Sequence, residues 1–300
     1  MTLSASRRAA SLLVVALTAA VLAVVTACGG TVPGHGNDAG TTTSPGGQGG
    51  ASAGHGRTVV SLTFDDAWAT QTVAADLLRA HHLVGTFYIN SGFLGRPKRL
   101  TRTQVEALAR AGNEIGGHTL THPRLPTLSR AAQRHQICDD RRALLAMGFR
   151  PRSFAYPYGM YDRTTIAVVR GCGYDSARRS GGLAGPADRC TQCLRAEDVR
   201  ATGPYELRTT PAVRRSMTLD ALTSYVRQAR ERGGGLVAFQ FHNVCDGCDE
   251  WGVRPDVLDG FFGWLEAQGV TVRRFGDVVG GSLRPMPRAA ARGMAVSAGA

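Results

Sequence analysis

Residues 58–66 read TVVSLTFDD, an apolar and β-branched run that ends in two aspartates. A run of this kind predicts a buried β-strand over 58–64, with Asp65 and Asp66 directly after it. Strand-like and helix-like segments then alternate along the chain. Repeated strand–helix units favour a parallel sheet that is closed or nearly closed into a barrel.

The expected elements follow from hydrophobic periodicity and from capping residues. We expect further strands at 84–89, 113–117, 153–156, 174–177, 236–241 and 270–272, and helices at 67–81, 103–110, 129–147, 162–170, 219–231 and 257–268. Thr101 or Thr103, Ser129 and Thr218 are suited to begin three of these helices. Residues 178–215 are expected to form an irregular surface segment, pinned by Cys190 and Cys193.

Three polar motifs come directly after expected strands. Besides Asp65 and Asp66, they are HTLTH at residues 118–122 and a histidine at 242. Reactive side chains of (β/α) barrels lie at the carboxyl ends of the strands, so these motifs should face the same end. The four-residue spacing of His118 and His122 is expected to place both imidazoles on one side of a helical turn.

Two imidazoles and one carboxylate, with one coordination position left open, can hold Zn²⁺ and a water molecule. The pair of aspartates at 65 and 66 supplies one carboxylate more than such a site needs. The spare carboxylate is then free to take a proton from the water. The residues alone therefore predict a metal-dependent hydrolase.

Five short segments resemble the ordered motifs of the polysaccharide deacetylases of the NodB-homology type, carbohydrate esterase family four. They are TFDD at 63–66, HTLTH at 118–122, FAYPYG at 154–159, YDSAR at 174–178 and FQFH at 239–242. The resemblance covers about 57–280 and implies a distorted (β/α) barrel with one divalent metal ion. It implies that Asp65 is the general base and that the metal ligands are Asp66, His118 and His122.

The last three motifs match the family unequally. The resemblance implies that the backbone N–H of Tyr158 contacts the oxyanion and that His242 is the general acid. The fourth motif lacks its tryptophan, which leaves Asp175 a poor match. Trp68, just after the aspartates, is expected either to line the sugar site or to belong to the core.

One position departs from the family in a way that bears on the base. Many members carry an arginine where Ala155 stands, and that arginine orients the base carboxylate. Arg152 and Arg178 are candidates to replace it, and the sequence places neither.

The activity implied by the resemblance is removal of N-acetyl groups from an extracellular or cell-wall polysaccharide containing N-acetylglucosamine, with release of acetate. Zn²⁺ is the expected ion, although Co²⁺, Mn²⁺ and Ni²⁺ also accept mixed N/O ligands. The FAYPYG form resembles the branch acting on poly-N-acetylglucosamine, and peptidoglycan and chitin remain open. Two alternatives are an O-acetyl esterase acting on a xylan-type polymer and a non-catalytic, metal-bearing carbohydrate-binding module. The presence of Asp65 and His242 disfavours the module, because a binder needs neither proton carrier.

The first 28 residues have the layout of an export signal, with Arg7 and Arg8 before an apolar run and small residues before Cys28. They resemble a bacterial lipoprotein signal, which implies a lipid on Cys28 and attachment to the outer face of the membrane. A transmembrane anchor and plain secretion are the alternatives. Residues 29–56 are rich in Gly, Ser and Thr and predict a flexible linker. Residues 57–282 are the expected catalytic domain and 283–300 a disordered tail.

Six cysteines remain besides Cys28, and an even set in an exported protein predicts disulfides. The alternative is a four-cysteine zinc site built from the CxxC pairs at 190–193 and 245–248. The second pair, directly after His242, is expected to form a constrained loop at the rim of the site. The positive residues behind the net charge of +12 are almost all arginine and would suit an anionic partner, but base composition is the preferred explanation. We expect a monomer that binds no nucleic acid.

Overall fold

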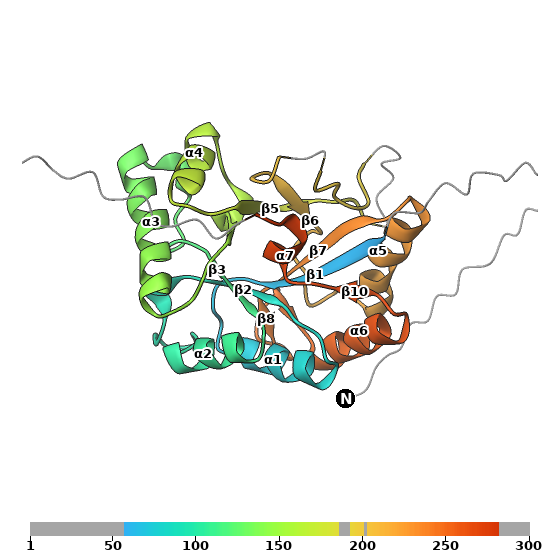
Figure 1. Ribbon diagram of the computed structural model, residues 1–300. Helices are drawn as coiled ribbons and strands as arrows, with labels where there is room; N and C mark the ends of the chain where they lie inside the picture. Colours follow the sequence, from blue (N-terminus) through green and yellow to red (C-terminus); the bar gives the residue numbers. More distant parts are fainter. Residues whose placement is uncertain (1–56, 186–192, 201–202, 282–300) are drawn as a thin grey trace, which may run out of the picture. The chain divides into compact units, whose positions relative to one another are not determined.

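The expected first strand forms where the sequence predicts it, and it organises the sheet. The computed structural model describes residues 57–185, 193–200 and 203–281, all within the compact unit Ala51–Ala300. The predicted signal, Cys28, the linker and the tail lie outside the described residues. The strands are β1 (Thr58–Phe64), β2 (Thr86–Ile89), β3 (Glu114–Gly117), β4 (Ser153–Ala155), β5 (Ser176–Gly182), β6 (Leu207–Thr209), β7 (Gly235–Phe241), β8 (Asn243–Val244), β9 (Gly252–Val253) and β10 (Thr271–Val272) (Figure 1).

The helices alternate with these strands. They are α1 (Gln71–Ala80), α2 (Arg102–Arg110), α3 (Arg130–Ala146), α4 (Arg163–Gly171), α5 (Leu219–Glu231), α6 (Pro255–Ala267) and α7 (Phe275–Val279), with short 3₁₀ turns η1 (Ser91–Phe93), η2 (Leu125–Thr127) and η3 (Pro157–Gly159). Thr101, Ser129 and Thr218 accept hydrogen bonds from backbone N–H groups in the first turns of α2, α3 and α5. These N-caps confirm the predicted helix starts, and each typically contributes about 1 kcal/mol.

The sheet is parallel and curls into a distorted barrel. Strand β1 pairs with β7 along its whole length, while its other edge meets β10 near its start and β2 near its end. The order then continues through β3, β4, β5 and β6. After β6, the N–H groups of Thr210 and Val213 donate to Ala238 and Gln240 of β7 at 2.9 and 2.8 Å. These bonds draw the far edge of the sheet toward β7, and the predicted (β/α) barrel is confirmed.

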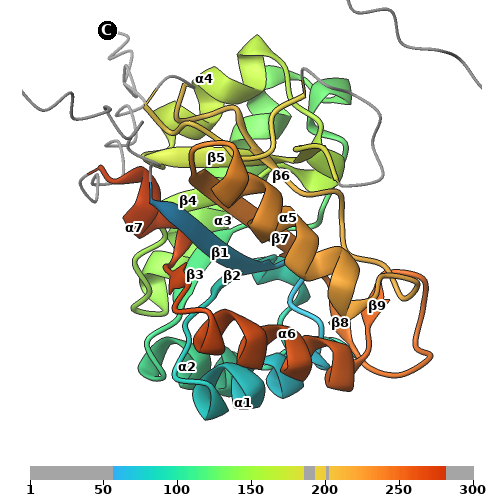
Figure 2. The same cartoon turned by 90° about the vertical axis from the view of Figure 1, so that its right-hand side faces the viewer.

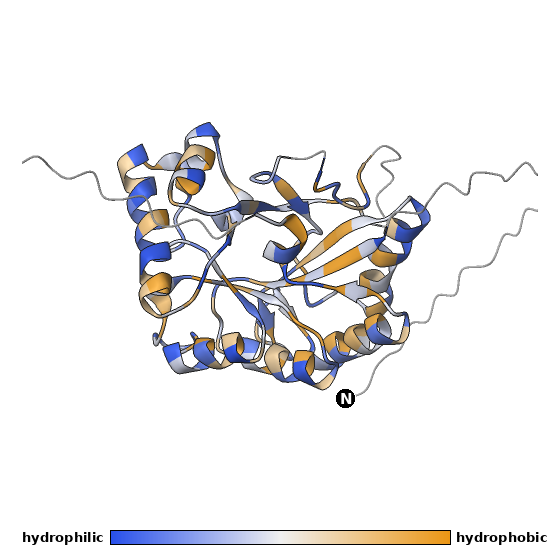
Figure 3. Ribbon diagram, in the orientation of Figure 1, coloured by the Kyte–Doolittle hydropathy of each residue, from blue (hydrophilic) through white to orange (hydrophobic). Residues whose placement is uncertain are grey.

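The core lies between the sheet and the helices that cover it. Phe64 of β1 is fully buried and stacks against Phe87 and Phe241, with ring centroids 4.7 and 5.2 Å apart. Burying each such ring contributes about 1.5–3 kcal/mol. Figure 3 shows the apolar residues concentrated along β1 and β7 and on the inner faces of the helices. Figures 1 and 2 agree that α1, α2 and α6 lie side by side on one flank of the sheet.

The expectation of an irregular segment over residues 178–215 is wrong in part. Strand β5 continues to Gly182, and β6 joins the sheet beside it. The sequence hides both strands because β5 reads SARRSGG, with an arginine rather than an apolar residue at the fully buried position 178. The two-residue strands β8 and β9, and the five-residue α7, were also not predicted.

The cysteines are paired as disulfides. Cys138 in α3 is bonded to Cys172 at the end of α4, and Cys245 is bonded to Cys248. Cys193 is disulfide-bonded as well, whereas Cys190 lies outside the described residues. Because Cys245 and Cys248 are joined to each other, the four-cysteine zinc site is contradicted.

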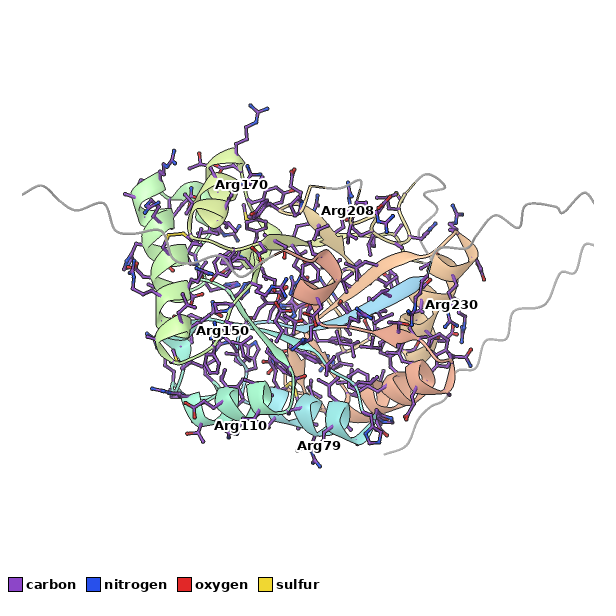
Figure 4. All side chains as sticks on the ribbon, viewed as in Figure 1. Arg79, Arg110, Arg150, Arg170, Arg208 and Arg230 are labelled. Carbon is purple, nitrogen blue, oxygen red and sulfur yellow. A yellow bond between two sulfur atoms is a disulfide. The ribbon has the colours of Figure 1, made fainter. Side chains whose placement is uncertain are left out.

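The arginines are spread over the molecule. Figure 4 shows Arg79, Arg110, Arg170 and Arg230, which belong to α1, α2, α4 and α5, at separate places around the periphery. The labelled arginines therefore form no single basic face, which favours the interpretation of the positive charge as a matter of composition.

Candidate metal centre

The backbone after β1, β3 and β4 turns in a way that few non-glycine residues allow. Asp66, Thr119, His122 and Tyr158 all have positive φ, at 74°, 71°, 56° and 58°. The left-handed conformation costs roughly 1–2 kcal/mol for such residues and clusters at functional sites. Among the residues that the structure describes, only Ala67, His82 and Lys98 share it outside glycine. Sharp turns at the ends of three strands thus bring side chains back over the same end of the sheet.

Three side chains at these strand ends, those of Asp66, His118 and His122, converge on one point. The Oδ1 atom of Asp66 lies 3.4 Å from Nε2 of His118 and 3.4 Å from Nε2 of His122. All three atoms lie within 4.8 Å of one another. Asp66 Oδ1 is buried and accepts no hydrogen bond from any described residue, an arrangement that is costly unless a cation is bound there. One carboxylate oxygen and two imidazole nitrogens fit a divalent ion with an open coordination position.

The surroundings of His118 fix its ring for such a role. Its Nδ1 donates to the carbonyl oxygen of Ala155 at 2.7 Å, which leaves Nε2 as the lone-pair nitrogen that faces Asp66. Its backbone N–H donates to Asp140, a fully buried carboxyl that also accepts the N–H of Ser91 at 2.9 Å. Burial raises the pKa of Asp140 to about 6. Asp140 therefore positions the backbone of His118.

The three converging groups shift one another's protonation. Burial disfavours the Asp66 carboxylate, but the close approach of His118 and the positive charge that the histidines can carry hold the pKa of Asp66 well below its usual range. Burial, together with the charge of His118, lowers the pKa of His122 to about 4. Burial also opposes the charged form of His118, yet Asp66 and Asp65 raise its pKa overall. Asp66 is thus a carboxylate and His122 a neutral imidazole at neutral pH, the forms that bind metals.

The expectation that His118 and His122 share a helical turn is wrong. Residues 118–122 contain no helix. The left-handed Thr119 redirects the chain, and its Oγ1 accepts the backbone N–H of His122 at 2.9 Å. The imidazoles meet through this turn, with ring centroids 4.7 Å apart.

The other aspartate, Asp65, is held by a hydrogen bond to each of its two carboxylate oxygens. Asp65 is 1% exposed, and its two carboxylate oxygens accept from Nη2 of Arg178 and, at 3.0 Å, from Nε2 of Gln240. Its backbone N–H donates to Phe241 of β7, and Gln71 at the start of α1 donates to the carbonyl oxygens of both Asp65 and His242. The carboxylate therefore has one defined orientation, which a general base requires.

Arg178 is the residue that holds the Asp65 carboxylate. It is fully buried, its guanidinium lies 4.6 Å from the ring centroid of Tyr88, and it stands on β5 directly opposite Ala155 of β4. Arg152, the other candidate, pairs with Asp175 at 3.5 Å and Asp277 at 3.6 Å. The arginine expected at position 155 is thus replaced from the neighbouring strand. The pairing of positions 155 and 178 in the sheet is the signal that would have identified it, and the sequence does not contain that pairing.

One cavity of about 330 Å³ contains the site. All six predicted site residues line it: Asp65, Asp66, His118, His122, Tyr158 and His242. Asp175 does not, since it is buried beside Arg152. Trp68 lines the cavity, and its Nε1 donates to Asp66 at 3.3 Å. Further lining residues that the sequence did not suggest are Ser180, Ala212, Gln240, Asn243, Asp249 and Trp251.

Tyr158 and His242 approach the three converging side chains from different strands. The ring of Tyr158, which is 56% exposed, lies 4.5 Å from that of His122 between centroids. The backbone N–H of Tyr158 has no acceptor among the described residues. His242 follows β7, and its Nδ1 is buried without a partner in the described part of the chain. The N–H of Tyr158 is therefore free to donate to a ligand, and the side chain of His242 lines the same cavity.

Comparison with known proteins gives partial matches. The family described as polysaccharide deacetylase matches residues 53–177. The peptidoglycan-N-acetylglucosamine deacetylase of Bacillus cereus is 31% identical over 103 residues, which are 33% of this chain and 36% of that protein. The chitooligosaccharide deacetylase of Bradyrhizobium is 29% identical over 114 residues, 36% of this chain and 50% of the relative. The chain thus spans half or less of the length of these relatives.

A solved structure agrees in fold. The family 4 acetyl xylan esterase of Clostridium thermocellum, in complex with a cobalt ion, superposes with a TM-score of 0.51 at 18% identity. The alignment covers 74% of this chain and 90% of the esterase. Arg178 and His242 lie beyond the residues that the family pattern matches, whereas the two aspartates, the two histidines and Tyr158 lie within them. Residues 53–177 of this chain thus carry the pattern of the polysaccharide deacetylase family.

Proposed function

We propose that this protein is a metal-dependent hydrolase that removes N-acetyl groups from a polysaccharide containing N-acetylglucosamine. The observation that carries the proposal is the arrangement in one cavity of two separate functions. Asp66, His118 and His122 converge as ligands, while Asp65 is held apart from them by Arg178 and Gln240. A protein that only binds a metal has no use for the second, oriented carboxylate.

The residues divide the proton transfers of amide hydrolysis between them. A divalent ion in the site would supply a Lewis acid that polarises the acetyl carbonyl. Asp65 accepts a proton from the attacking water, and the N–H of Tyr158 donates to the oxyanion that forms. His242 donates a proton to the nitrogen as the carbon–nitrogen bond breaks. The products are acetate and a free amino sugar.

The named relatives support this substrate class. The two curated relatives described above are a peptidoglycan-N-acetylglucosamine deacetylase and a chitooligosaccharide deacetylase. O-deacetylation is the second candidate, because the structural neighbour is an acetyl xylan esterase and the same groups would serve an ester. The ion is proposed to be Zn²⁺, with Co²⁺, Mn²⁺ and Ni²⁺ as alternatives.

Acetate release tests the proposal directly. The zinc-loaded protein should release acetate from N-acetylglucosamine oligomers, and a chelator should abolish the release until Zn²⁺ is restored. Release from an O-acetylated xylan but not from the oligomers would replace the amide reaction by the ester reaction. If neither substrate releases acetate while metal analysis shows one ion per chain, the protein is a binding module and the proposal fails.

We also propose that the protein is exported and anchored by a lipid on Cys28. The disulfides Cys138–Cys172 and Cys245–Cys248 support an oxidising compartment. As a separate finding, no helix in the described ranges is long and apolar enough to cross a membrane. Bacteria grown with labelled palmitate should incorporate label into the native chain but not into Cys28→Ala. Equal labelling of the two chains would contradict the lipid anchor.

A further inference from the structure

Asp249 and Trp251 line the cavity but have no part in the proposed reaction. They belong to the segment between β8 and β9, residues 245–251, which we call the rim loop. The loop begins three residues after His242, at the end of β8. Figure 2 shows β8 and β9 beyond the end of the sheet toward which β1 runs.

The rim loop is held in one shape by several contacts. The Cys245–Cys248 disulfide closes its first half. The carboxylate of Asp249 accepts from Nδ2 of Asn243 at 2.7 Å and from the backbone N–H of Trp251 at 2.9 Å. Thr70, just before α1, donates to Oδ1 of Asn243 at 2.8 Å and so ties the loop to the strand-end turn that carries the aspartates. The two cavity-lining side chains are therefore oriented before any ligand binds.

The indole of Trp251 is also held from outside the loop. The guanidinium of Arg214 lies 4.2 Å from its ring centroid, and Arg214 is itself paired with Glu250 at 3.2 Å. A ring that is already fixed loses little side-chain entropy when a ligand packs on it. Asp249 has two partners, while an ionised carboxylate has about four acceptor positions, so it can accept further hydrogen bonds. A rigid aromatic ring beside a carboxylate with free acceptor positions suits a ligand with both apolar C–H faces and hydroxyl groups.

The position of Trp251 relative to His242 indicates which part of a ligand Asp249 and Trp251 would contact. The rings of His242 and Trp251 are 5.8 Å apart between centroids. In the proposed reaction, His242 protonates the leaving nitrogen, and that nitrogen is attached to the sugar. Trp251 therefore lies on the sugar side of the amide, away from the acetyl group.

We propose that Asp249 and Trp251 form a sugar subsite that binds a pyranose ring of the polymer on the leaving-nitrogen side. Trp251 packs against the ring face and Asp249 accepts its hydroxyl groups. The subsite rests on the proposed function, because it takes its orientation from the role of His242. Such a subsite would make the cavity bind acetylated sugars more tightly than small acetylated compounds.

Binding measurements test the subsite without turnover. The zinc-loaded Asp65→Asn protein serves as the background, and chitopentaose and acetohydroxamate serve as probes in calorimetric titrations. Acetohydroxamate contains no sugar and contacts only the metal centre. Adding Trp251→Ala or Asp249→Asn should weaken chitopentaose binding at least about tenfold, and should change acetohydroxamate binding less than about twofold. Trp251→Phe should recover part of the loss.

The same loop provides the matched control. Asp246 is exposed and does not line the cavity, so Asp246→Asn should bind both probes like the background. Equal weakening of both probes by Trp251→Ala, or unchanged chitopentaose binding, would overturn the subsite. The proposed function fails separately: if the native protein releases no acetate while the variants still lose chitopentaose alone, the subsite stands and the hydrolase does not.

Discussion

Replacing Asp65 with asparagine should lower the rate of acetate release by about two to four orders of magnitude and leave the bound metal in place. The change removes the proton acceptor, and general-base catalysis contributes about 10²–10⁴-fold. Asparagine keeps an oxygen for Arg178, and the amide of Gln240 can turn to meet it because its Oε1 has no partner. The orientation of the side chain is thus preserved while its basicity is lost. Steady-state rates and metal analysis on the same samples check both parts.

Comparison with His118→Ala separates the two proposed functions of the site, proton transfer by Asp65 and metal binding by Asp66 with the histidines. It removes one of the three converging ligand atoms, so both metal content and activity should fall. The contrast requires that the Asp65→Asn chain holds one ion and the His118→Ala chain holds less. Loss of metal from Asp65→Asn would place Asp65 among the ligands, and retained activity in that variant would remove it from the reaction.

Replacing Arg178 with methionine should slow the reaction by about a hundredfold, mostly in kcat, and displace its pH profile. Among the described residues, Arg178 is the buried guanidinium that pairs with the Asp65 carboxylate. Removing one partner of a buried ion pair lowers stability by about 3–5 kcal/mol, because the other charge stays buried without compensation. A buried carboxylate without a cation holds its proton to higher pH. The acid limb of the kcat–pH profile of the variant should therefore lie at higher pH than that of the native protein.

The sheet offers a rescue for this variant. Positions 155 and 178 are paired across β4 and β5, so an arginine placed at 155 can approach Asp65 from the adjacent strand. The double variant Ala155→Arg with Arg178→Met should regain part of the rate and the native acid limb. Arg152→Met is the matched control, because Arg152 pairs with Asp175 and Asp277 instead and should affect stability alone. If Arg178→Met reacts more slowly but the acid limb of its pH profile does not shift, then Arg178 has a purely structural role.

The sequence predicts those parts of the site that depend on local pattern. The β-branched, apolar composition of residues 58–64 predicts a strand, and the alternation of strands with helices predicts a parallel sheet. Asp65 and Asp66 follow this strand directly, so their position at the end of the sheet could be predicted. Arg178 could not be assigned, because its partner lies 113 residues away in the chain and depends on how β4 and β5 pair. The turn at His118 also escaped prediction. Four-residue spacing suggests a helix, and only the conformation of Thr119 shows that the chain turns the other way.

The non-glycine residues with left-handed backbone conformation restrict how this protein can evolve greater thermostability. At Ala67, Thr119 and Tyr158, glycine would relieve the left-handed backbone conformation, which costs other residues roughly 1–2 kcal/mol. Here the same substitutions would loosen the turns that aim Asp66 and His122. Greater thermostability gained at these positions would come at the expense of turnover. Adaptation to higher temperature should therefore accumulate in the helices and the sheet, while these turns stay as they are.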